Sequence, residues 1–110
     1  MKETLAVTVA GLAYVVATSF ANAQEFGDAK KGAILAERIC AECHAVKNGE
    51  ARSPNANAPK FGNVAKTSGM TSTALRVWLQ TSHPTMPNLV LENEEKDNII
   101  AYLMSLKSDR

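Results

Sequence analysis

Cysteine is scarce in this chain, with 2 among 110 residues, far too few for a disulfide-rich scaffold. Glycine and proline are also few, at 6 and 4 residues, which excludes a collagen-like repeat and a long low-complexity linker. The formal net charge is only +1, so no overall charge attracts the chain to nucleic acid. The remaining composition, with 45% hydrophobic and 21% charged residues, is typical of one small globular domain.

The first 23 residues are predicted to be a cleaved secretory signal peptide. They combine positive charge at the amino terminus, an uncharged apolar run over residues 5–17, and a small-x-small pattern at Ala21-Asn22-Ala23. The competing interpretation is an uncleaved membrane anchor, because the charge-free stretch of residues 4–24 is long enough to span a bilayer. The Ala-x-Ala pattern favours cleavage, which leaves residues 24–110 as the mature domain and no stable membrane insertion.

The mature domain is predicted to be all-α, with three main helices and long loops. Apolar side chains recur at helical spacing in three segments, about residues 28–43, 72–80 and 93–107. Asp28 is expected to cap the first helix, and Thr71 or Ser72 the second. No segment alternates convincingly with period 2, so we expect no substantial sheet. Residues 45–69 show no periodicity and predict a loop whose length is uncommon in a compact domain, unless it packs on something such as a large apolar cofactor.

Gly32 lies inside the first predicted helix. A glycine at such a position costs up to about 1 kcal/mol relative to alanine. Either the helix tolerates this defect, or the backbone of another helix approaches closely at Gly32 and leaves no space for a side chain.

One motif carries specific chemistry: Cys40-Ala41-Glu42-Cys43-His44 has the C-x-x-C-H pattern of c-type haem attachment. Two thiols at this spacing can reach both vinyl groups at one porphyrin edge and form thioethers. The adjacent His44 can then coordinate the iron as the proximal ligand. The motif therefore predicts one covalent haem c.

Three other interpretations of the motif are weaker. A dithiol redox motif would need a βαβ context, which the sequence does not predict. A zinc site would need Cys40, Cys43, His44 and His83 together, and adjacent Cys43 and His44 do not follow zinc-finger spacing. A disulfide between the two cysteines would close a very small loop and stabilise little.

Met86 is the predicted sixth ligand of the iron, because a methionine can fill that position and raise the reduction potential. Pro84 and Pro87 flank it and restrict its loop. The alternative is that Met86 fills a gap between loop and core, as we expect Met104 to do on the last helix. His83 is the competing ligand, and an open sixth position is a further possibility.

The mature chain resembles the small class I cytochromes c of bacterial periplasms over residues 26–107. Besides Gly32 and the haem motif, the similarity includes Ala58-Pro59-x-Phe61, Leu75-x-x-Trp78-Leu79, Met86-Pro87-Asn88-Leu89 and Ile100-Ala101-Tyr102-Leu103.

The resemblance implies roles for several of these residues. The first and last helices should cross, with Gly32 close to Tyr102. The carbonyl of Pro59 should accept the Nδ1 proton of His44, which fixes the imidazole. The haem walls should be formed by Phe61, Leu75 and Leu79. Trp78 should either donate to a haem propionate or pack in the core.

The predicted function is a soluble, monomeric, periplasmic electron carrier, not an enzyme. Its iron would cycle between ferrous and ferric states with His44 and Met86 bound in both. Its partners would be redox proteins, one a donor and one an acceptor, such as a respiratory or dehydrogenase complex. The alternatives are a haem-based gas or redox sensor and a small peroxidase. Both need an open or labile sixth position, and His83 is the only distal candidate for acid–base chemistry.

Overall fold

The computed structural model describes residues 26–108, which form four α-helices and no strand. The helices are α1 (Ala29–Ile39), α2 (Phe61–Lys66), α3 (Ser72–Gln80) and α4 (Asn93–Ser105). The predicted signal peptide, residues 1–23, lies outside this range. Within the range, no helix is long and apolar enough to cross a membrane. The prediction of an all-α domain is therefore confirmed for the described residues.

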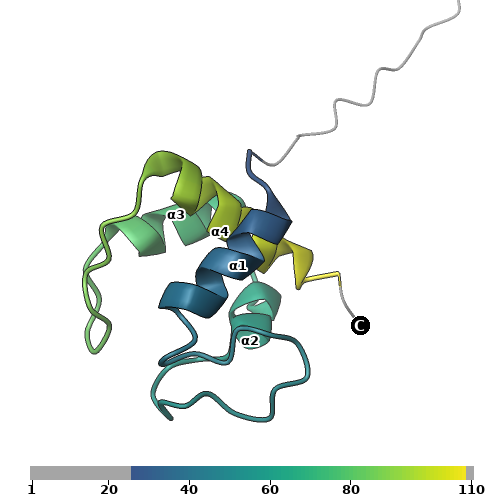
Figure 1. Cartoon of the computed structure of the whole chain (residues 1–110), viewed down its shortest axis with the longest axis vertical. Coiled ribbons are helices and arrows are strands. Elements are labelled where there is room, and N and C mark those ends of the chain that lie inside the picture. Colours follow the sequence, from purple (N-terminus) through teal and green to yellow (C-terminus); the bar gives the residue numbers. More distant parts are fainter. Residues whose placement is uncertain (1–25, 109–110) are drawn as a thin grey trace, which may run out of the picture.

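Helices α1 and α4 cross at the centre of the fold, and α2 and α3 also contact α4 (Figure 1). Gly32 is buried at the crossing. A Cβ atom on Gly32 would lie 1.9 Å from the backbone oxygen of Asn98 and 2.8 Å from Cβ of Tyr102. Real Cβ atoms do not approach backbone atoms so closely, so only glycine fits at this crossing. The close approach predicted at Gly32 is thus confirmed.

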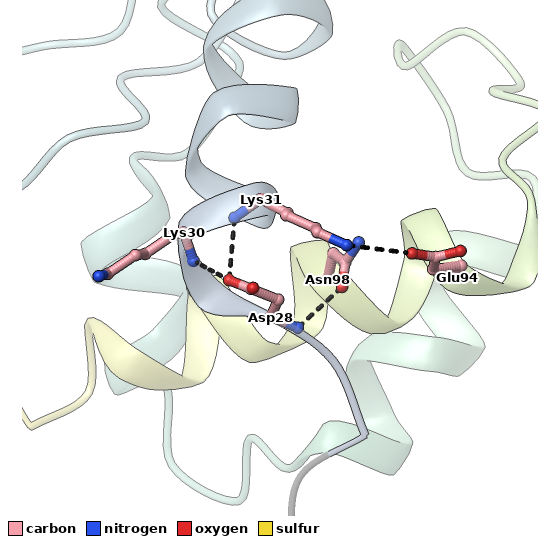
Figure 2. Close-up of polar contacts among 5 residues, drawn as sticks. All are labelled: Asp28, Lys30, Lys31, Glu94 and Asn98. Atoms are coloured by element: carbon pink, nitrogen blue, oxygen red, sulfur yellow. Dashed lines mark hydrogen bonds and ion pairs between the residues drawn. The ribbon is translucent and has the colours of Figure 1, made fainter.

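Polar contacts fix the start of α1 against α4 (Figure 2). The Asp28 carboxylate accepts from the backbone N–H groups of Lys30 and Lys31, at 2.8 and 3.1 Å. These hydrogen bonds lower the pKa of Asp28. The backbone N–H of Asp28 donates to Oδ1 of buried Asn98 at 2.8 Å, and Lys31 pairs with Glu94 across the two helices. The predicted cap therefore also sets the position of α1 on α4.

The core is a single cluster that draws on all four helices and on the segments between them. Its buried members are Leu35, Ala36, Cys40, Val46, Phe61, Ala65, Leu75, Leu91, Ile99, Ile100, Leu103 and Leu106. Met70 and Met104 are partly buried and pack against this cluster. The expectation that Met104 is a packing residue is confirmed.

Two predicted helix ends and one predicted loop were wrong. The last helix was expected to reach about residue 107 but ends at Ser105. The first helix was expected to reach Cys43 but ends at Ile39, because the N–H of Ala41 bonds to Ala36 five residues back instead of four, and this breaks the α-helical pattern. The predicted loop of residues 45–69 contains α2. A helix of this length is marginal by itself, and burial of its Phe61 and Ala65 in the core stabilises it.

Tyr102 links α4 to the segment that follows the cysteine motif. Its hydroxyl donates to the carbonyl of buried Val46 at 2.6 Å. Tyr102→Phe removes this donor, and we expect it to lower the free energy of unfolding by about 1–2 kcal/mol. Urea unfolding of the two proteins measures the difference. Ser105→Ala is the control on the same helix, because its exposed hydroxyl donates locally, to the Tyr102 carbonyl three residues back. We expect a change within about 0.5 kcal/mol. Equal stabilities of Tyr102→Phe and wild type would contradict this role.

Candidate functional site

The two cysteines and His44 lie on tight turns directly after α1. Cys40 caps the helix, and the backbone N–H groups of Cys43 and His44 both donate to the Cys40 carbonyl, at 3.2 and 2.9 Å. Cys40 and Cys43 form no disulfide with each other. Cys40 is buried, and this burial raises the pKa of its thiol to about 11, whereas Cys43 is half-buried. The site therefore presents two thiols close together on the chain, followed at once by an imidazole.

His44 has the orientation expected of a metal-binding histidine. Its Nδ1 lies 2.7 Å from the carbonyl oxygen of Pro59. A carbonyl oxygen can only accept, so Nδ1 carries the proton and Nε2 keeps a lone pair, the form in which imidazole binds a metal. The ring also packs against Phe61, with 5.3 Å between ring centroids. This donor set suits haem c, with thiols for attachment and one oriented nitrogen for iron.

The loop after His44 is fixed by hydrogen bonds to the motif. The backbone N–H of Ala45 donates to Oγ of buried Ser53 at 2.9 Å, and the carbonyl of Ala45 accepts from the N–H of Phe61 at 2.9 Å. The N–H of Asn55 donates to the Cys43 carbonyl at 3.1 Å. The role of Ser53 was not predicted, because a serine in an aperiodic segment carries no recognisable pattern. These bonds position the loop that brings Pro59 to His44.

The predicted wall residues divide into two groups. Phe61 and Leu75 are buried in the same cluster as Cys40, and Leu79 is half-buried against it. Trp78 is 54% exposed, so of its two expected roles core packing is wrong, and donation to a haem propionate stays a prediction. Its ring instead meets the imidazole of His83 edge-on, with centroids 5.2 Å apart. On α3, therefore, one face enters the core and Trp78 turns toward the loop that follows the helix.

Met86 and His83 are both half-buried and touch each other on the loop of residues 81–91. Sδ of Met86 lies 2.9 Å from Nε2 of His83. Nδ1 of the same imidazole lies 3.1 Å from the Thr81 carbonyl. Thr85 has a φ of 71°, a left-handed conformation that is rare for a β-branched residue. The two residues predicted as competing ligands thus lie side by side.

The zinc interpretation does not agree with the structure. Between residues 26 and 108, no group of three or more His, Cys, Asp or Glu side chains is placed to hold a metal ion. The four ligands that such a site would need are therefore not close enough together to bind one metal ion.

A separate cavity of about 330 Å³ opens beside His44, and its lining residues are Ala41, His44, Glu50, Ala51, Arg52 and Pro54.

An all-helical fold with a crossing at glycine, a C-x-x-C-H turn and an oriented histidine defines a haem-binding domain of the c type. Residues 29–107 match the model of the Cytochrome c family, and the chain belongs to this family. It is 38% identical over 98 residues to cytochrome c-552 of Bradyrhizobium diazoefficiens, which covers 88% of this chain and 93% of the relative. No solved structure matches the chain significantly. The chain is thus a small class I monohaem cytochrome c and a haem-based electron carrier, and its family implies covalent haem c and redox-protein partners.

Proposed function

We propose that this protein is a soluble, monomeric electron carrier of the periplasm, with one haem c attached through Cys40 and Cys43. His44 and Met86 are the residues that would hold its iron in both oxidation states. Residues 1–23 direct export and are removed, and residues 24–110 form the mature carrier. It exchanges electrons with one donor and one acceptor protein and catalyses no reaction of its own. The observation that carries the proposal is the hydrogen bond from His44 Nδ1 to Pro59.

The residues of the site have three roles: some attach the haem, some orient the histidine, and some exclude water. Cys40 and Cys43 provide the sulfur atoms for the two thioethers, and Pro59 holds the His44 ring with Nε2 available. When bound, haem supplies reversible one-electron transfer through its iron. Apolar side chains such as Phe61 and Leu75 keep water away, which disfavours the additional positive charge of the ferric state and raises the potential.

Met86 is proposed as the sixth ligand because of its loop. Pro84 and Pro87 each fix one backbone φ angle, which reduces the number of conformations the loop can adopt. The other methionines of the described chain, Met70 and Met104, pack against the core. A thioether ligand that stays bound in both oxidation states keeps structural change on electron transfer small. Such a site has no open position for a substrate or a gas.

The test is an optical titration of the purified holoprotein in its ferric, ferrous, and ferrous plus carbon monoxide states. We expect a c-type spectrum, the red ferric iron–sulfur charge-transfer band, and no response to carbon monoxide. Met86→Ala should lose this band completely, because the band requires the iron–sulfur bond. Met104→Ala, which changes a methionine packed on the core, should keep it. The intact mass of the same preparation reports whether cleavage follows Ala23.

Two results would refute parts of this proposal. A ready response of the wild-type protein to carbon monoxide would mean an open or labile sixth position, which would favour a sensor or a peroxidase. If Met86→Ala kept the charge-transfer band, the sulfur bound to the iron would belong to another methionine. A chain that ends up without covalent haem would refute the proposal as a whole.

A further inference from the structure

The two histidines of this chain have the same hydrogen-bond arrangement. Nδ1 of His44 lies 2.7 Å from the Pro59 carbonyl, and Nδ1 of His83 lies 3.1 Å from the Thr81 carbonyl. A carbonyl oxygen cannot donate, so in the neutral tautomer that uses these two contacts each Nδ1 carries the proton and each Nε2 keeps a lone pair. Metal-binding histidines typically use one ring nitrogen in this way to orient the other. His83 is therefore prepared for metal binding in the same sense as His44.

The lone pair of His83 meets the sulfur of Met86. Nε2 and Sδ are 2.9 Å apart, within hydrogen-bond distance. A proton on Nε2 would be donated to the sulfur, whereas with the proton on Nδ1 both atoms present lone pairs. In the tautomer with the proton on Nδ1, two electron-pair donors lie side by side. A shared electron-pair acceptor would stabilise this arrangement. Met86 is the proposed ligand of the haem iron, and His83 is in direct contact with Met86.

Neighbouring residues hold the His83 ring in place. Trp78 packs edge-on against it at an interplanar angle of 81°, and the side chain is half-buried. The left-handed conformation of Thr85 closes the turn that brings residues 83 and 86 together. The imidazole is thus held by α3 on one side and by its own loop on the other, and it does not extend freely into solvent.

We propose that His83 is a reserve sixth ligand, which binds the haem iron through Nε2 whenever Met86 does not. This inference rests on the proposed ligation by Met86. In the exchange, the iron–sulfur bond breaks and an iron–nitrogen bond forms, and both ligands are neutral, so no electron or proton is transferred. Imidazole favours the ferric state more than a thioether does, so the exchange lowers the potential. The site stays closed to gases in both states.

The test compares four holoprotein variants with wild type: His83→Ala, Met86→Ala, Met86→Ala/His83→Ala and Met86→Ala/Asn88→Ala. The spin state of the ferric iron is read by electron paramagnetic resonance, and carbon monoxide binding to the ferrous form is read optically. Asn88 accepts a hydrogen bond from Ser82 on the same loop at 2.8 Å. Its replacement disturbs the loop without removing a metal ligand, so it is the matched control.

We expect Met86→Ala to remain low-spin, to resist carbon monoxide and to have a lower potential than wild type. Adding His83→Ala should convert it completely to a high-spin form that binds carbon monoxide, whereas adding Asn88→Ala should not. His83→Ala alone should keep the iron–sulfur band.

Three results would refute the reserve role of His83, and they differ in whether the proposed carrier function is refuted as well. A high-spin Met86→Ala that binds carbon monoxide refutes the reserve ligand and leaves the proposed carrier intact. Loss of the iron–sulfur band in His83→Ala alone would mean that His83 positions Met86 instead of replacing it. A wild-type protein without the band refutes the proposed function first, and the reserve role with it.

Discussion

Replacing Gly32 with alanine should lower the free energy of unfolding by about 3 kcal/mol or more, because there is no space for a methyl group at the helix crossing. The new Cβ would lie 1.9 Å from the backbone oxygen of Asn98. A backbone atom inside α4 cannot move aside as a flexible side chain can. The two helices would have to separate and lose packing along the whole crossing. Since small domains are stable by only about 5–15 kcal/mol, this is a large fraction of the total.

Gly62→Ala is the matched control, because Gly62 is also a helical glycine. A Cβ there would meet only the side-chain oxygen of Asn48, at 3.0 Å. Alanine is the better helix former, so we expect a change within about 1 kcal/mol in either direction. Chemical denaturation of both holoproteins, followed by far-ultraviolet circular dichroism, measures the difference. If the two variants are equally stable, the crossing does not need glycine at residue 32.

The double variant Cys40→Ala/Cys43→Ala should contain no covalently bound haem. The thioether bonds are formed by these two sulfur atoms, and residues 26–108 contain no other thiol. Extraction with acidified organic solvent should therefore remove all haem from the double variant and none from wild type. Each single variant should keep one thioether, with a reduced yield of holoprotein.

Glu42→Ala controls for disturbance of the turn itself. Glu42 lies between the two cysteines and is exposed, so its replacement should leave attachment unchanged. Haem that resists extraction from the double cysteine variant would mean that another side chain forms the covalent bond. Such a result would refute the assignment of the motif.

Much of the fold could be predicted from local sequence signals. Helix α3 begins and ends at the predicted residues because Thr71 accepts from the N–H of Ala74 at 3.1 Å and Leu75 supplies a clear apolar face. The anomaly at Gly32 correctly indicated a close helix crossing. Both signals are local, so they are visible without knowledge of the tertiary structure.

Other features depend on contacts between distant segments and could not be predicted. Helix α2 has too few residues for a periodic pattern, and burial in the core decides its formation. Ser53 acquires its role only because the loop folds back to Ala45. The outward position of Trp78 depends on where His83 lies, which helical spacing does not indicate. The Pro59 contact was implied by family resemblance and not by any pattern in the chain itself.

The crossing of α1 and α4 also sets the order in which this domain can assemble. Asp28 and Asn98, which bond to each other, are 70 residues apart in the chain. Closing so long a loop has an entropic cost before its contacts form, so the crossing is completed only when the end of the chain is present. Before α4 docks, Gly32 has no helix packed against it and Cys40 is not yet buried in the core. A chain delivered from its amino terminus thus leaves the attachment cysteines accessible for a period that ends when α4 docks.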